Sequence, residues 1–154
     1  MQQIANLPFM NLRLANLQLG GLSTELTMLV LAIALGLFQL LIAARANNYQ
    51  RGIIWNVGAR DEPGAPTSKL AGRLERAFRN FLETFPFFAA VVLVATFADR
   101  HNWATIWGVQ LYFWGRVIYL PLYALGIPVL RTLVWVAATI GIILIVVAIL
   151  APGI

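Results

Sequence analysis

The chain has 154 residues, of which 60% are hydrophobic and only 11% are charged. Soluble domains are roughly 45–50% apolar and about 25% charged, so this composition excludes an ordinary soluble domain and indicates an integral membrane protein. The net charge is +5 and cysteine is absent, which excludes disulfides and cysteine nucleophiles. No stretch interleaves basic with aromatic residues, so we expect no nucleic-acid partner.

The first apolar stretch is LTMLVLAIALGLFQLLIAA, residues 26–44, which carries no charge. At a rise of about 1.5 Å per residue it nearly crosses a hydrocarbon core of about 30 Å. We expect a helix over about 24–47, capped by Ser23 or Thr24. Residues 1–22 lack a basic start followed by an apolar core, so they are interpreted as an N-terminal extramembrane tail and not as a signal peptide.

Three further helices are expected, over about 68–98, 102–125 and 128–151. The uncharged part of the first of these covers only 84–98, so it needs part of the preceding polar stretch to cross the bilayer. The links between the later helices are short, which favours antiparallel neighbours. The sequence therefore predicts an all-α fold, in which a membrane domain over 23–154 forms a bundle of four transmembrane helices.

Basic residues are concentrated between the first and second expected helices. Cytoplasmic loops carry an excess of lysine and arginine, so the positive-inside rule places this loop in the cytoplasm and both termini on the other side. The link at 126–128 then also faces the cytoplasm. The polar start of the fourth helix, with Arg131, therefore reaches the same leaflet as Arg45.

Polar side chains recur at helical spacing on the second and third expected helices. At about 100° per residue, those on the second helix fall within an arc of roughly 80° and those on the third within roughly 60°. The first set is Arg73, Arg76, Asn80 and Glu83, and the second is Tyr112, Arg116, Tyr119 and Tyr123. Each of these helices thus presents one polar stripe.

Charged groups at membrane depth cost at least about 2.5–3.5 kcal/mol each on insertion scales, so they normally face the bundle and pair. Glu83 is expected near mid-depth, with Arg116 as its cationic partner. Such a cluster can simply pin helices together, and for Glu83 and Asn80 that interpretation carries equal weight with a binding role. The arginines nevertheless outnumber this one glutamate, and an excess of buried arginine favours an anionic ligand.

Other residues give weaker signals. We expect His101, in a short loop, to be solvated. Trp103, Trp107 and Trp135 are expected at the membrane interface or facing lipid. The sequence has no zinc-ligand spacing, phosphate loop or Ser-His-Asp set, so it predicts no metal site and no known hydrolytic motif.

The stretch ERAFRNFLETFPF, residues 75–87, resembles the most characteristic segment of the membrane-associated proteins in eicosanoid and glutathione metabolism (MAPEG). This family includes the microsomal glutathione transferases. The next two helices extend the resemblance with Arg116, Tyr123, Pro128 and Arg131. It covers about residues 24–150, and the loop NVGARDEP is similar to that of a bacterial branch.

The resemblance implies a homotrimer in the bacterial inner membrane, with the substrate glutathione held between subunits near the cytoplasmic side. The implied glutathione ligands are Arg45, Arg76, Asn80, Glu83, Arg116 and Tyr123. The implied catalytic residue is Arg131, whose guanidinium favours the thiolate. A lipophilic electrophile or hydroperoxide would arrive through membrane lipid, as in a detoxifying glutathione transferase or peroxidase, and no metal is implied.

Two positions depart from the family pattern. Thr132 stands where the prostaglandin-forming branch carries serine, and Trp135 replaces a tyrosine that serves the thiolate in other branches. Both departures argue against eicosanoid isomerase chemistry. Two alternatives stay open: a non-catalytic membrane protein that binds an anion or a lipid headgroup, and a small transporter subunit with Glu83 as its proton or cation site.

Overall fold

The computed structural model describes residues 21–59 and 66–151, so the predicted tail over 1–22 lies almost entirely outside the described residues. The described part is helical and contains no strand, which confirms the predicted all-α class. Its helices are α1 (Thr24–Arg51), α2 (Ile53–Val57), α3 (Lys69–Phe97), α4 (Trp103–Leu125) and α5 (Pro128–Leu150).

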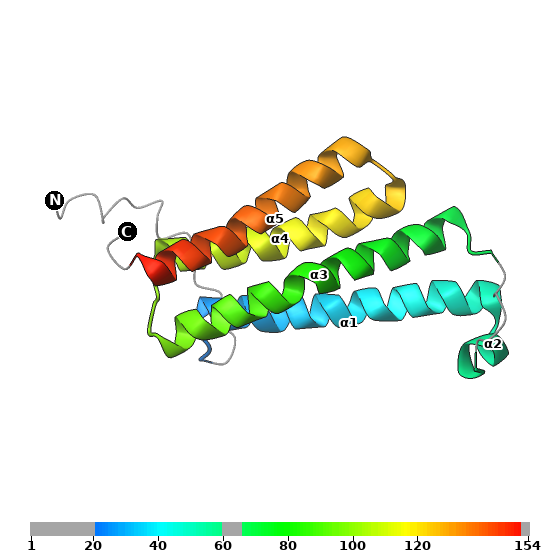
Figure 1. Cartoon of the computed structure of the whole chain (residues 1–154), viewed down its shortest axis with the longest axis horizontal. Helices are drawn as coiled ribbons and strands as arrows, with labels where there is room; N and C mark the ends of the chain where they lie inside the picture. The colour runs from blue at the N-terminus through cyan, green and yellow to red at the C-terminus, as the bar shows by residue number, and fades with distance from the viewer. Residues whose placement is uncertain (1–20, 60–65, 152–154) are drawn as a thin grey trace.

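Three of the four long helices, α1, α3 and α5, are long and apolar enough to cross a membrane. The fourth, α4, has 23 residues, as many as α5, and this length suffices for a hydrocarbon core of about 30 Å. It is not among the candidate spans, because its tyrosines, its tryptophans and Arg116 lower its hydropathy. A fourth crossing therefore stays a prediction, which the antiparallel course of α4 beside α5 favours (Figure 1).

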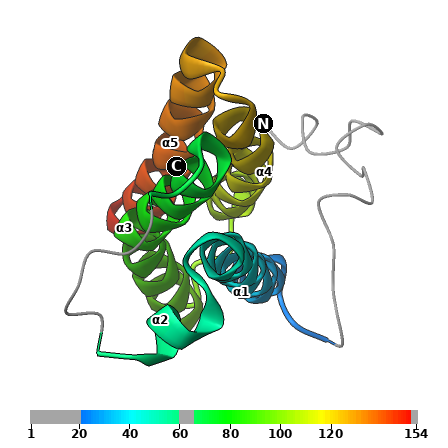
Figure 2. The same cartoon turned by 90° about the vertical axis from the view of Figure 1, so that its right-hand side faces the viewer.

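The long helices run side by side in alternating directions (Figure 1). α1 packs on α3 and α4 packs on α5, while α3 contacts both α4 and α5 and so joins the two pairs. One end of the bundle holds α2 and the α4–α5 turn (Figure 2), and we call it the basic end. Its cationic residues in the described part of the chain include Arg45, Arg51, Lys69, Arg73, Arg76 and Arg131. The other end, where α1 begins, is called the Glu25 end.

Polar side chains cap three of the long helices. The hydroxyl groups of Ser23 and Ser68 each accept a hydrogen bond from the backbone N–H three residues on, at 3.3 and 3.2 Å. Asn102 forms a capping box with Thr105 at the start of α4. α5 begins with Pro128 and has no side-chain cap, so its first turn keeps the positive potential of an uncapped helix start.

α1 continues to Arg51 and does not end near residue 47, and the segment expected to be a loop contains α2. The helix ends where Gly52 takes a φ of +82°, an angle that glycine adopts without steric cost. Residues 45–51 include no glycine and no proline. α1 therefore meets no helix-breaking residue between Arg45 and Gly52.

The core of the bundle combines aromatic rings with small residues. Phe88 of α3 stacks on Tyr112 of α4 with ring centroids 3.9 Å apart, and both side chains are fully buried. Met28, Val92 and Ile145 are buried in the same cluster. Many leucine, isoleucine and valine side chains are exposed on the outer faces of this single subunit, and such apolar surfaces suit lipid or another subunit.

α4 and α5 approach each other most closely toward the Glu25 end. A Cβ atom on Gly108 would lie 2.7 Å from the carbonyl oxygen of Gly141, and one on Gly115 would lie 3.0 Å from Cβ of Ala138. Only small residues permit this spacing. Toward the connecting turn the two helices separate (Figure 1). There the interior side chains are large: Tyr119, Tyr123, Arg131 and Trp135.

Candidate functional site

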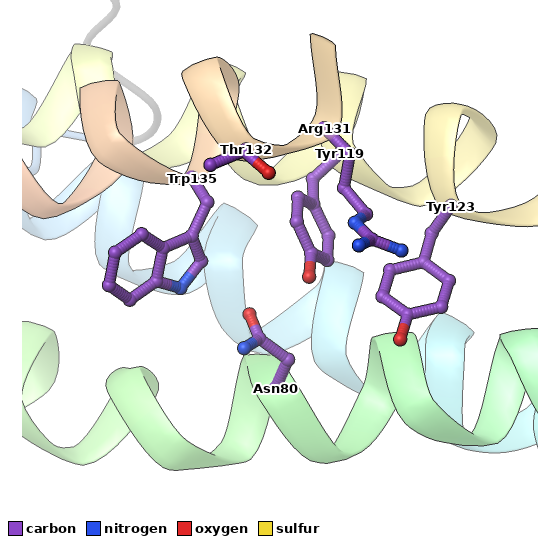
Figure 3. A pocket seen from close by; sticks show the side chains of 6 residues that line it. All are labelled: Asn80, Tyr119, Tyr123, Arg131, Thr132 and Trp135. Carbon is purple, nitrogen blue, oxygen red and sulfur yellow. The ribbon is translucent and has the colours of Figure 1, made fainter. Parts of the chain in front are cut away.

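A cavity of about 340 Å³ lies at the basic end between α3, α4 and α5. Figure 3 shows Asn80 reaching from α3 toward side chains that extend from α4 and α5. We call this space the Arg131 cavity, and it is lined by Asn80, Tyr119, Tyr123, Arg131, Thr132 and Trp135. It brings together three residues of the predicted glutathione site, namely Asn80, Tyr123 and Arg131.

Arg131 lies near the start of α5, which begins at Pro128. Its guanidinium carbon is 4.5 Å from the centroid of the Tyr123 ring, and this ring lies 5.4 Å from the ring of Tyr119. A cation–π contact orients a guanidinium without neutralising it. The charge of Arg131 therefore remains available to an anion in the cavity.

Arg116 of α4 is 2% exposed. One guanidinium nitrogen donates to Oδ1 of Asn80 at 2.7 Å, and the other donates to the hydroxyl group of Thr84. Thr84 also shares a hydrogen bond of 3.2 Å with the hydroxyl group of Tyr112. All these partners are neutral, so they position Arg116 without supplying a countercharge.

The predicted ion pair between Glu83 and Arg116 is wrong for the single subunit. Glu83 is exposed, and its carboxylate accepts a hydrogen bond of 3.4 Å from the side-chain amide of Asn80, whose oxygen accepts from Arg116. No ion pair joins Glu83 to a cation in the described residues. Three residues along a helix rotate a side chain about 60° from its starting direction, which carries Glu83 outward from Asn80.

Two buried N–H groups at this site lack a hydrogen-bond partner within the described part of the chain. They are Nε of Arg116 and the indole Nε1 of Trp135. Buried donors are normally paired, so each unpaired one calls for an explanation. Trp135 lies on the cavity wall (Figure 3), where a ligand acceptor would complete its hydrogen bonding.

The ring of Trp135 lines the cavity, whereas its residue type alone led us to expect it at the interface or facing lipid. Its spacing of four residues from Arg131 puts both side chains on one face of α5, and this signal could have found it. Thr132 also lines the cavity, but its hydroxyl group donates to the carbonyl oxygen of Pro128 at 3.0 Å. Tyr119 belongs to the predicted α4 stripe.

The remaining predicted ligands lie outside the Arg131 cavity in the single subunit. Arg76 and Glu83 are exposed on α3. Arg45 lines a separate hollow of about 780 Å³. Arg116 is buried in α4 and does not line the cavity. One subunit therefore divides the predicted glutathione residues between the cavity, the bundle interior, the surface of α3 and a second hollow.

The opposite end of the bundle also buries a charged side chain. Glu25 is 2% exposed, and its carboxylate accepts a hydrogen bond of 2.7 Å from the hydroxyl group of Thr105. His101 is not simply solvated, because its Nδ1 lies 3.2 Å from the same carboxylate and its side chain is 37% exposed. We call these three residues, with the capping residue Asn102, the Glu25 cluster.

The Arg131 cavity is an electropositive site. Among residues 21–59 and 66–151, no carboxylate forms an ion pair with Arg116 or Arg131. Phenol hydroxyl groups and an unpaired indole N–H accompany the cations. Such a set binds an anion and stabilises negative charge that develops on a bound atom. In the same described part, no group of histidine, cysteine, aspartate or glutamate side chains could hold a metal ion.

Comparison with known proteins gives one positive finding. The model of the MAPEG family matches residues 28–151. The match begins one turn into α1 and then covers the remaining helices. Among curated protein sequences, no match is found.

Proposed function

The chain belongs to the MAPEG family, and from this premise we propose that it is a glutathione-dependent transferase or peroxidase of the membrane. Family membership and the apolar helices make it an integral membrane protein. Membership also indicates glutathione-related or eicosanoid-related metabolism at the level of the family. The observation that carries the narrower proposal is the Arg131 cavity. Neither Arg131, which lines it, nor Arg116, which is hydrogen-bonded to Asn80 of its wall, has a carboxylate partner in the described chain.

Glutathione has two carboxylates, an ammonium group and a thiol, and the side chains near the cavity complement each of them. Arg116 and Arg76 are proposed to bind the carboxylates, and Glu83 the ammonium group. Asn80 and Tyr123 supply hydrogen bonds, and Arg131 is proposed to face the sulfur. The exposure of Glu83 and its one long hydrogen bond to Asn80 support this assignment, because its carboxylate keeps most of its capacity to accept.

A homotrimer with glutathione between subunits is part of the proposal. α3 is a candidate membrane span, yet it exposes the charged side chains of Arg76 and Glu83 in one subunit. Charged groups at membrane depth normally face protein or a polar cavity, so a neighbouring subunit would cover them. Arg45 lines the separate hollow of one subunit, and it stays a proposed glutathione ligand that a neighbouring subunit would bring to the site.

The proposed chemistry rests on a stabilised thiolate. A free thiol with a pKa of about 8.5 is mostly protonated at neutral pH, and a nearby guanidinium favours the nucleophilic thiolate. Arg131 is permanently charged, and the uncapped start of α5 adds positive potential. In conjugation, the thiolate electron pair forms a C–S bond and the leaving group departs with the electrons of its own bond. In hydroperoxide reduction, the thiolate attacks the terminal oxygen, the O–O bond breaks, and the alkoxide leaves and takes up a proton to become the alcohol. The thiol of a second glutathione then attacks the resulting sulfenic acid, which gives the disulfide and water.

The second substrate is proposed to be lipophilic and to enter from membrane lipid, because apolar side chains cover the outer faces of the bundle. The basic end would face the cytoplasm and both termini the other side of a bacterial inner membrane. The concentration of arginine and lysine at the basic end supports this orientation.

The test is the ultraviolet difference spectrum of the thiolate while the detergent-purified protein is titrated with glutathione at neutral pH. We expect a saturable thiolate band that Arg131→Ala abolishes, while calorimetry shows glutathione still bound. Arg100→Ala removes the same charge at the Glu25 end and should keep the band. If neither a band nor binding of glutathione is found with the native chain, the proposal is wrong.

A further inference from the structure

Arg73 of α3 contacts the turn that joins α4 to α5. Its Nη1 donates a hydrogen bond of 3.1 Å to the carbonyl oxygen of Ala124, near the end of α4. The start of α3 and this turn lie at the same end of the bundle (Figure 1). The last carbonyl oxygens of a helix have no partner within it, and a cation placed there also meets the negative end of the helix dipole. Arg73 therefore caps α4 from a neighbouring helix.

The sequence of the turn explains why the Ala124 carbonyl needs a partner from outside. In a continuous helix this oxygen would accept a hydrogen bond from the backbone N–H of residue 128. That residue is Pro128, which has no N–H group. The carbonyl oxygen of Leu122, in contrast, accepts from the backbone N–H of Gly126 at 3.0 Å. The guanidinium of Arg73 thus supplies a donor that the backbone cannot supply.

The turn leaves room for this guanidinium because Gly126 has no side chain. Gly126 follows the last residue of α4 and takes a φ of +79°, in the left-handed region that glycine adopts without steric cost. A Cβ atom on Gly126 would lie 2.6 Å from Nη2 and 2.9 Å from Nη1 of Arg73, well inside the optimal separation of non-bonded atoms. The guanidinium therefore occupies the place where another residue would have its Cβ atom.

The turn also carries two residues of the Arg131 cavity. Tyr123 directly precedes Ala124, and Arg131 lies in the first turn of α5, which begins at Pro128. The contact of 4.5 Å between the Arg131 guanidinium and the Tyr123 ring spans the turn. A displacement of the turn against α3 would therefore move Arg131 relative to Asn80, which lines the cavity from α3.

We propose that Arg73 is a positioning residue, which holds the α4–α5 turn against α3 so that Arg131 meets the sulfur atom of bound glutathione. This inference rests on the proposed function, because it concerns the residue that would face the sulfur. Arg73 does not line the Arg131 cavity, so it would act through the turn and not by contact with glutathione. The attraction between a guanidinium and a thiolate falls with their separation. A displaced Arg131 would therefore stabilise the thiolate less, while the rest of glutathione stays bound.

The test follows the ultraviolet thiolate band of bound glutathione as a function of pH, with the full chain in detergent. Arg73→Gln should raise the pKa of the bound thiol by about one unit. The dissociation constant of glutathione should stay within about twofold of the native value, because no ligand contact is lost. Lys69→Gln is the matched control, because it removes an exposed charge one helical turn from Arg73. It should leave both quantities unchanged.

Gly126→Asn separates the position of Arg73 from its charge. Asparagine tolerates the left-handed backbone of this turn, but its Cβ atom would displace the guanidinium. The variant should raise the pKa of the bound thiol as Arg73→Gln does, and the double variant should show no further rise. An unchanged pKa in Gly126→Asn would show that Arg73 acts by charge alone and would overturn the proposal. So would a loss of glutathione affinity of about tenfold or more in Arg73→Gln, because Arg73 would then be a ligand.

Hydrogen exchange of the α4–α5 turn gives a measurement that needs no glutathione. Arg73→Gln should speed exchange at the backbone N–H groups of Gly126 and Ile127, which are hydrogen-bonded in the turn, by about fivefold, the effect of one lost hydrogen bond. Lys69→Gln should leave this exchange unchanged. Native exchange rates in Arg73→Gln would overturn the proposal. If the native chain binds no glutathione, faster exchange in Arg73→Gln would still show that Arg73 holds the turn, and the proposed function alone would be wrong.

Discussion

Glu25 and Arg116 are equally buried, each 2% exposed, yet their surroundings differ in kind. The Glu25 carboxylate accepts a hydrogen bond from Thr105 and contacts His101, so the chain itself supplies its partners. Within the described part of the chain, Arg116 has only neutral hydrogen-bond partners, and its Nε has none. The chain thus supplies partners for the Glu25 carboxylate, whereas its described part supplies no countercharge for the Arg116 guanidinium.

The two residues also differ in what lies beside them. Glu25 joins the first turn of α1 to the capping box of α4, a place where burial of a charge fixes two helix ends. Arg116 is bonded to Asn80, and Asn80 lines the Arg131 cavity. A buried charge with a complete set of partners indicates a structural role, and one with incomplete partners beside a cavity indicates a binding role.

The largest expected effect is the loss of glutathione affinity when Arg116 is replaced, and it tests the binding role of this residue. Arg116→Met should weaken glutathione binding about 100-fold, because an uncompensated buried cation is worth about 2–5 kcal/mol to an anionic ligand. Isothermal calorimetry in detergent measures it. Arg116→Lys keeps the charge but cannot make both side-on hydrogen bonds, so an intermediate loss is expected. Unchanged affinity in a folded Arg116→Met protein would assign Arg116 a structural role.

Glu25→Ala should lower the stability of the protein and leave its glutathione affinity almost unchanged. Removal of a buried, hydrogen-bonded carboxylate is expected to cost about 2 kcal/mol of unfolding free energy, measured by denaturant titration in detergent. Glutathione affinity should stay within about twofold, because the cavity lies at the other end of the bundle. Glu75→Ala, which removes an exposed partner of Arg79, is the matched control and should cost less than about 0.5 kcal/mol.

Trp135→Phe tests whether the indole N–H in the cavity wall binds the ligand. It removes an indole N–H that is buried and unpaired, so unfolding free energy should not fall by the cost of a lost hydrogen bond. Glutathione should bind about fivefold more weakly, the equivalent of about 1 kcal/mol for one hydrogen bond. Trp107→Phe changes an exposed tryptophan of α4 and should leave affinity unchanged. Equal affinities for both variants would contradict a ligand contact by Trp135.

The smallest expected effect is at the rim of the Glu25 cluster. His101 is partly exposed, and a solvent-accessible contact of this kind contributes only about 0.2–1 kcal/mol. His101→Gln should therefore lower the unfolding free energy by about 0.5 kcal/mol, measured as for Glu25→Ala. A loss as large as that of Glu25→Ala would show that the imidazole, and not Thr105, is the main partner of the carboxylate.

Much of the fold could be predicted from the sequence because hydrophobic length and helix-capping chemistry are local properties. The uncharged run 26–44 and the cap at Ser23 specify the start of α1. The end of α1 was harder to predict, because Gly52 alone marks it and the intervening polar residues resemble a loop. The short helix α2 has no periodic signal in five residues, so pattern reasoning had no means to detect it.

The candidate site was predicted in part for a similar reason. Helical spacing correctly grouped Tyr119 and Tyr123, whose rings lie 5.4 Å apart. It did not predict that Asn80 stands between Arg116 and Glu83, because the relative rotation of α3 and α4 depends on packing and not on spacing within either helix. The inward direction of Trp135, in contrast, follows from its spacing of four residues from Arg131 on α5.

The close approach of Gly108 and Gly141 makes the width of the Arg131 cavity a property of the whole α4–α5 pair. From Gly108 to Tyr123 is about 22 Å along α4 at 1.5 Å per residue, so a small change in crossing angle at the glycines becomes a larger displacement at the cavity. A methyl group at either position would push α4 and α5 apart at their point of closest approach and so change their crossing angle. Variation at two residues far from any ligand could therefore tune which substrates the cavity admits, with every lining side chain left unchanged.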